Sequence, residues 1–351
     1  MSDGTTPRPP DPASAPSGSL RRRILTRVAF LLVAAVALYI LWPSLAKVFS
    51  AVPDLDEIAP GWFLAMLALE AASFAAMWVL LAITLRSRKW FAIGTAQLAG
   101  NAVGRVVPGG AAAGAAAQYT LMVQGGVEAT RVGTGVTAAS LISTATIFAL
   151  PLLSVPAVLA SAGIPDGLVH AVWLGGAVLG LAFAAGAMLL FRDRPVERVG
   201  HAIAWVLRRM RRPASGEQLA ERLVDERDLL RTTLRSDWWK AVLASLANWL
   251  LDYLALLAAL TAVGARPDPP LVLLAYASSM VLGMIPLTPG GLGFVEAGLT
   301  GTLALAGVSG AEAVLAILAY RLVSYWLPMP VGGIAYWLAR RRSGAKPLPA
   351  N

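Results

Sequence analysis

The sequence predicts an all-α polytopic membrane protein with about six full spans and two broken (re-entrant) helical hairpins, arranged as an inverted repeat. Hydrophobic residues make up 57% of the 351 residues and charged residues only 14%, a balance outside the range of soluble proteins. Apolar stretches long enough to cross a bilayer recur along the chain. Two further apolar stretches are each interrupted by a Pro-Gly-Gly sequence, and both halves have the same order of segments.

The elements follow in order from the N-terminus. Residues 1–20 are rich in Pro, Ser, Thr and Gly, so they are predicted to form a disordered cytoplasmic tail. Four arginines precede the first apolar run, but a clear small-residue cleavage site is lacking, which favours an uncleaved first span over a signal peptide. The predicted full spans are residues 28–45, 61–85, 132–160, 168–191, 238–263 and 311–339.

Residues 90–125 and 270–307 are predicted to be broken hairpins. The first is interrupted by Pro108-Gly109-Gly110 and the second by Pro289-Gly290-Gly291, where a missing N–H and a flexible backbone would end a helix. Each stretch would therefore form two helical arms joined at a tip. The alternative is that the arms cross the membrane completely, because residues 90–107 are nearly long enough to do so.

The distribution of positive charge predicts cytoplasmic termini and a location in the inner (plasma) membrane. With hairpins that enter and leave by one side, all but four of the 29 Lys and Arg residues fall in cytoplasmic segments. Lys47 and Arg266 fall in outer segments, and Arg105 and Arg321 lie inside apolar segments. The net charge of +9 therefore indicates membrane topology rather than nucleic-acid binding. Residues 192–237 become a cytoplasmic segment with an apolar stripe suited to an interfacial helix.

A faint internal repeat relates the two halves. When the Pro-Gly-Gly tips are aligned, Gly126-Val127 and Gly307-Val308 follow at the same offset, and Glu70 and Asp252 precede them at offsets that agree to within one residue. The halves begin on opposite sides, so a two-fold axis in the membrane plane would relate them, as recurs in transporters. The predicted units are a first repeat 21–165, a second repeat 166–342 with a cytoplasmic insertion 192–237, and a cytoplasmic tail 343–351.

The hairpins and the intramembrane arginines are the first candidates for a binding site. Helices that restart after Gly110 and Gly291 would direct their N-termini toward the tips and favour phosphate or carboxylate groups, unless the tips are only tight turns. An intramembrane arginine is costly and usually has a partner. Arg321 could pair with Glu296 or contact phosphate directly. Arg105 could serve the site or extend to an interface.

Intramembrane carboxyl and amide groups are the second set of candidates. Glu70 and Asp252 lie at about equivalent depth in the two halves and could couple transport to protons, or could instead be hydrogen-bonded to neighbouring helices. Four further polar residues could line a cavity or bond helix to helix: Asn101, Asn248, Gln118 and Tyr119. Gly332 and Gly333 would permit close helix packing.

The second broken segment carries a family resemblance. Residues 285–296, Ile-Pro-Leu-Thr-Pro-Gly-Gly-Leu-Gly-Phe-Val-Glu, followed by Gly307-Val308 and Arg321, resemble the lysylphosphatidylglycerol synthase transmembrane region, a flippase-like membrane family. In the first segment, three features look like that family's earlier Pro-Gly hairpin: Asn101, Pro108-Gly109-Gly110 and Gln118-Tyr119. The resemblance covers about residues 25–340.

This resemblance implies movement of a polar-headed lipid between leaflets. The family's soluble synthase domain is not expected, because the chain ends at Asn351, and its synthase activity is therefore not carried over. Mostly alanine follows the glycines of the first hairpin, where the family is expected to have more polar residues, so the identity of the lipid stays open.

The predicted function is a lipid translocase with a site between the two inverted repeats. The alternatives are a secondary carrier of a small soluble solute and a membrane-embedded enzyme acting on lipid-linked substrates. A Gly-rich nucleotide loop, a His and carboxylate cluster and a nucleophile with its base are not found, so no catalytic residue, metal or cofactor is expected. The expected partners are membrane lipids with polar or anionic headgroups, with no nucleic acid and a possible homo-oligomer.

Overall fold

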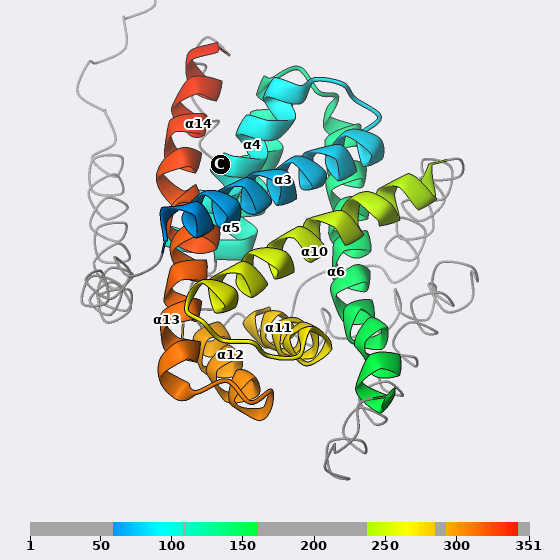
Figure 1. Cartoon of the computed structure of the whole chain (residues 1–351). Coiled ribbons are helices and arrows are strands. Elements are labelled where there is room, and N and C mark those ends of the chain that lie inside the picture. Colours follow the sequence, from blue (N-terminus) through cyan, green and yellow to red (C-terminus); the bar gives the residue numbers. More distant parts are fainter. Residues whose placement is uncertain (1–58, 108–109, 161–236, 285–292, 343–351) are drawn as a thin grey trace, which may run out of the picture.

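The computed structural model describes residues 59–107, 110–160, 237–284 and 293–342, and these ranges contain helices and no strand (Figure 1). The predicted all-α class is therefore confirmed for this part of the chain. The helices are α3 (Pro60–Thr84), α4 (Trp90–Val106), α5 (Gly110–Gln124), α6 (Ala129–Ala160), α10 (Trp238–Ala262), α11 (Pro269–Gly283), α12 (Phe294–Leu305), α13 (Gly310–Arg321), the π-helical turn η2 (Leu322–Trp326) and α14 (Pro328–Arg342).

Four described helical segments are long and apolar enough to cross a membrane. They are Pro60–Thr84, Ala129–Pro151, Trp238–Ala262 and Gly310–Arg342, the last being the continuous run of α13, η2 and α14. These segments coincide with four of the six predicted spans. The predicted spans 28–45 and 168–191, the segment 192–237 apart from its last residue, and both predicted tails lie outside the described residues.

Each broken stretch forms two helices that pack against each other. A Cβ built on Gly110 of α5 would lie 1.9 Å from the carbonyl oxygen of Gly104 of α4, so only glycine allows this approach. In the second pair, a Cβ built on Gly283 of α11 would lie 2.5 Å from Cγ2 of Val295 of α12. Each interrupted stretch thus consists of two packed arms, as the Pro-Gly-Gly sequences predict.

The second arm of each pair ends in the same helix cap. Gly126 after α5 and Gly307 after α12 have φ of 84° and 83°, in the left-handed region that favours glycine. The N–H of Val127 donates to the carbonyl of Met122 at 3.0 Å, and the N–H of Val308 donates to that of Leu303 at 3.1 Å. These six-to-one bonds are Schellman caps, which gives the matching Gly-Val pairs a physical cause.

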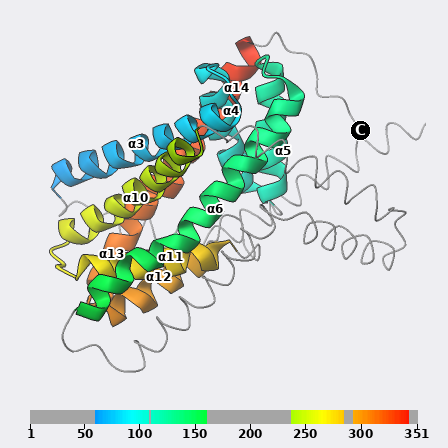
Figure 2. The same ribbon diagram turned by 90° about the vertical axis from the view of Figure 1, so that its right-hand side faces the viewer.

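The arms of one half pack on the final span of the other. Helix α4 packs against α14, and α11 packs against α6, while α3 and α10 lie side by side between them. The α4 and α5 pair lies toward one end of the molecule and the α11 and α12 pair toward the other (Figures 1 and 2). The two helix pairs therefore lie on opposite sides of the contact between α3 and α10.

Basic residues gather at one end of the described bundle. The ammonium group of Lys89 donates to the carbonyl of Gly126, and the guanidinium of Arg342 lies 4.5 Å from the ring centroid of Phe91. Arg86 and Arg131 line a pocket between the end of α3 and the start of α6. These residues belong to segments that the sequence predicts to face the cytoplasm.

Candidate functional site

A cavity of about 300 Å³ lies among α3, α4, α10, α11, α12, α13 and η2. Six residues singled out from the sequence line it: Glu70, Asn101, Arg105, Asn248, Asp252 and Arg321. The two carboxyl groups come from near the middle of α3 and α10, which are 25 residues long each. Residues far apart in the sequence, and from both halves of the chain, therefore meet in one polar space.

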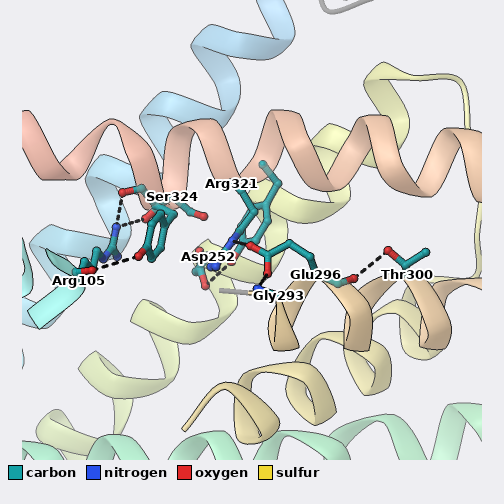
Figure 3. Close-up of polar contacts among 9 residues, drawn as sticks. Arg105, Asp252, Gly293, Glu296, Thr300, Arg321 and Ser324 are labelled. Carbon is teal, nitrogen blue, oxygen red and sulfur yellow. Dashed lines mark hydrogen bonds and ion pairs between the residues drawn. The ribbon is translucent and has the colours of Figure 1, made fainter. Parts of the chain in front are cut away.

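Arg321 is held by an ion pair with Glu296. Its Nε donates to Oε1 of Glu296 at 2.7 Å, and the arginine and glutamate side chains are 8% and 28% exposed. Oε2 of Glu296 accepts from the N–H of Gly293 at 2.6 Å, so the same carboxylate also caps the start of α12 (Figure 3). The predicted pairing of Arg321 with Glu296 is confirmed.

One nitrogen of Arg321 has no protein partner. Among the described residues, only two buried side-chain polar atoms lack a hydrogen bond, Nη2 of Arg321 and Oε2 of Glu70, and both residues line the cavity. A buried charged N–H without an acceptor is costly, because it gives up water and receives nothing in return. The two atoms mark the positions where a ligand in the cavity would find a donor and an acceptor.

Arg105 binds backbone carbonyls of the other half. Its Nη1 donates to the carbonyl of Ser324 at 2.9 Å and to that of Tyr325 at 2.6 Å. Pro328 has no N–H to give to the carbonyl of Ser324 four residues earlier, and the chain forms a π-helical turn there, with Leu327 N–H donating to Leu322 at 2.9 Å. Arg105 thus donates to carbonyls at a gap in the hydrogen bonding of the helix, and of the two alternatives for this residue, extension to an interface is not borne out.

Tyr325 lies between the two arginines. The guanidinium carbons of Arg105 and Arg321 are 4.7 and 4.4 Å from its ring centroid, within the range of cation–π attraction. The ring therefore attracts both cations and helps to hold them at one site.

The carboxyl groups of Glu70 and Asp252 both line the cavity, from helices α3 and α10, which pack side by side. Asp252 accepts hydrogen bonds from the hydroxyl of Tyr276 and, at 3.0 Å to each oxygen, from the hydroxyl of Tyr320. Glu70 is 6% exposed, and its Oε2 accepts no hydrogen bond. The prediction of carboxyl groups bonded to neighbouring helices therefore describes Asp252 well and Glu70 only in part.

A reciprocal pair of hydrogen bonds joins α3 to α10 beside the carboxyl groups. The hydroxyl of Ser73 donates to the carbonyl of Asn248 at 3.0 Å, and Nδ2 of Asn248 donates to the carbonyl of Ser73 at 3.0 Å. Asn248 lines the cavity and bonds helix to helix at the same time.

Other predicted site residues do not line this cavity. Gln118 packs inside the first helix pair, since a Cβ built on Gly100 would lie 2.8 Å from its Cβ. Tyr119, one residue on, is 41% exposed, because it points away from that contact. Gly110 starts α5 and packs on Gly104. The remaining tip residues lie outside the described ranges: Pro108, Gly109, Pro289, Gly290 and Gly291.

The tyrosines of the site were not predicted from the sequence. Tyr276, Tyr320 and Tyr325 are all buried, and two of them bond to Asp252 while the third contacts both arginines. The sequence feature that could have identified them is their position. A tyrosine inside an apolar segment, rather than near its end, needs a buried partner for its hydroxyl.

Comparisons with known proteins find a family model that matches most of the chain. The sequence model of the family described as "Lysylphosphatidylglycerol synthase TM region" matches residues 26–332. A UPF0104 membrane protein of Methanothermobacter thermautotrophicus (strain Delta H) is 33% identical over 91 residues, 26% of this chain and 26% of the relative. A UPF0104 membrane protein of Pyrococcus horikoshii is 32% identical over 126 residues, 34% of this chain and 38% of the relative. The chain therefore matches well under half the length of these relatives.

Proposed function

Because the chain belongs to the lysylphosphatidylglycerol synthase TM region family of membrane proteins, we propose that it is a lipid translocase. It moves a lipid with a polar or anionic headgroup between leaflets, with the headgroup in the cavity between the two halves and the acyl chains in the bilayer. The observation that carries the proposal is the buried, unpartnered Nη2 of Arg321 in that cavity.

A phosphate group fits the unpartnered donor. Arginine binds phosphate oxygens through paired N–H groups, and its charge makes these bonds stronger than neutral ones. Arg105 supplies a second positive charge beside the ring of Tyr325. A volume of about 300 Å³ is at the low end of ligand cavities and suits a headgroup rather than a whole lipid.

We further propose that the halves form an inverted repeat and that both helix pairs are re-entrant. The exchanged contacts, α4 on α14 and α11 on α6, support a two-fold relation between halves. Arg105 and Met284 lie beside the two tips, yet they line the same cavity as Glu70 and Asp252 from the middle of α3 and α10. This supports tips that end near the membrane midplane.

The depth of the tips is testable with single cysteines, since the chain contains none to remove. We expect Ser309→Cys, at the exposed turn between α12 and α13, to react with a membrane-impermeant maleimide from one side only. Met284→Cys should be protected from both sides. Fast labelling of Met284→Cys from the side opposite Ser309 would indicate arms that cross completely.

The function is tested by reconstitution into liposomes that contain head-labelled fluorescent phosphatidylglycerol. A membrane-impermeant quencher removes signal from the outer leaflet, and translocation is read from the loss of the protected signal. We expect the wild-type protein to accelerate this loss and Arg321→Ala to abolish the acceleration. Arg131→Ala is the matched control, because Arg131 is a surface arginine whose side chain is 56% exposed.

A second variant separates loss of function from misfolding. Arg321→Gln combined with Glu296→Gln keeps a hydrogen-bonding pair and removes both charges, so it should fold and still fail to move the lipid. Translocation by this variant at the wild-type rate would contradict the proposal.

A carrier of a small anionic solute is the second candidate, favoured by the modest size of the cavity. It predicts uptake of a soluble phosphate ester such as glycerol phosphate into the same liposomes, lost in Arg321→Ala, with no movement of labelled lipid. That result would replace the lipid proposal.

A further inference from the structure

Two carboxyl groups meet where α3 and α10 cross the cavity. Glu70 is almost fully buried and Asp252 is half-buried, and both line the cavity from two helices that pack side by side. Two carboxylates in contact at low dielectric do not both ionise, because the repulsion between like charges exceeds the cost of keeping one proton. Burial of Glu70 and the nearby carboxyl group of Asp252 both oppose a second negative charge at this place, so the pair holds one proton.

The hydrogen bonds indicate which of the two carboxyl groups carries the negative charge. Asp252 receives O–H donors from Tyr276 on α11 and Tyr320 on α13, and donors of this kind stabilise a carboxylate. Glu70 receives no donor at Oε2. The charge therefore belongs on Asp252 and the proton on Glu70, whose free oxygen lies at the cavity where a proton can be exchanged.

The other charged groups around the pair determine the net charge at the cavity. Arg105 faces it from α4, and Arg321 faces it from α13 with Glu296 of α12 as its partner. Tyr325 of η2 adds a phenol at the cavity, and the α6 residues that hydrogen-bond to α10 are Ser143 and Thr146, which do not titrate.

With Glu70 protonated, two arginines balance Asp252 and Glu296, and the described charged side chains at the cavity sum to zero. Loss of the proton leaves one excess negative charge beside the place where an anionic headgroup would bind. Proton binding and headgroup binding then favour each other, and this coupling acts equally in both directions.

We propose that Glu70 and Asp252 form a one-proton binding site and that this proton is the ion coupled to headgroup movement. The second half of the proposal rests on the proposed translocase function, whereas the first half stands on the carboxyl pair itself.

The proton site is tested by infrared spectroscopy of the protein in lipid nanodiscs. At neutral pH the wild type should have a carboxylic acid C=O band that is lost in Glu70→Gln, whose amide can still donate to Asp252. Glu128→Gln is the control, because Glu128 is an exposed carboxylate paired with Arg131 at 2.9 Å, and it should keep the band. An unchanged band in Glu70→Gln would overturn the proton site.

The coupling is tested in the liposome assay and by proton uptake. Wild-type translocation of labelled phosphatidylglycerol should slow as pH rises, and short-chain phosphatidylglycerol added in weak buffer should cause proton uptake by the protein. Glu70→Gln should lose both effects, and Glu128→Gln should retain them. Translocation that is equally pH-dependent in Glu70→Gln would overturn the coupling and leave the translocase intact. Loss of the infrared band without any lipid movement would instead keep the proton site and reject the translocase.

Discussion

Gly332 and Gly333 are neighbours on α14, but only Gly332 faces another helix. A Cβ built on Gly332 would lie 2.4 Å from the carbonyl oxygen of Leu98 and 2.5 Å from Cβ of Ala102, both on α4. A Cβ built on Gly333 meets no atom within 4 Å. The contacts at Gly332 involve a backbone oxygen and a methyl group that no rotamer change can move, so α4 itself would have to shift.

We therefore expect Gly332→Ala to lower the free energy of unfolding by about 1–3 kcal/mol, the usual cost of overpacking. Gly333→Ala should be neutral or raise it by up to about 1 kcal/mol, because alanine favours the helix more than glycine does. The shift of α4 would also displace Arg105, so Gly332→Ala should slow lipid translocation.

The measurement is thermal denaturation in detergent, followed by intrinsic tryptophan fluorescence, with both variants compared with the wild type. Gly333→Ala is the matched control for composition and position. Equal denaturation midpoints for the two variants would refute the packing of α14 on α4 described here.

Three further changes test contacts of the site. Arg105→Met should lower the free energy of unfolding by about 2 kcal/mol or more, because buried carbonyls lose their donors; combining it with Pro328→Ala, which restores an N–H, should recover part of that loss in a double-mutant cycle. Glu296→Gln should cost about 1.5–3 kcal/mol, because one amide oxygen replaces the two charged oxygens that accept from Arg321 and Gly293, whereas Glu312→Gln, in an exposed capping box, should cost about 1 kcal/mol or less in the same denaturation assay. Ser73→Ala should cost about 0.6 kcal/mol, the average for a hydrogen bond between membrane helices, and a loss of several kcal/mol would contradict the geometry.

The helices were predictable because their signals are local. Long apolar runs and Pro-Gly-Gly interruptions depend only on neighbours in the sequence, and the described spans and helix arms begin and end close to the predicted residues. The matching Gly126-Val127 and Gly307-Val308 pairs proved to be identical caps, a feature that glycine in the left-handed region makes visible in the sequence.

The contacts of the site were less predictable because they join distant segments. The ion pair of Arg321 with Glu296 was one of two alternatives that the sequence offered, since both are isolated charges on nearby apolar helices. The carbonyl partners of Arg105 depend on a proline 223 positions away, and no periodicity in the sequence links the two. Gln118 was expected at the cavity on polarity alone, but it packs closely against Gly100, between α4 and α5.

The role of Arg105 at the π-helical turn has a consequence for movement. Its bonds to the carbonyls of Ser324 and Tyr325 tie the first helix pair to the final span of the other half. Moving that pair requires new partners for both the guanidinium and the carbonyls, because neither can be left bare in a dry interior. A headgroup phosphate can serve the guanidinium, and water admitted with it can serve the carbonyls. Headgroup binding and release of the helix pair would then be one event, so we expect Arg105→Lys, which keeps the charge but loses the planar fork, to retain headgroup binding and slow its movement.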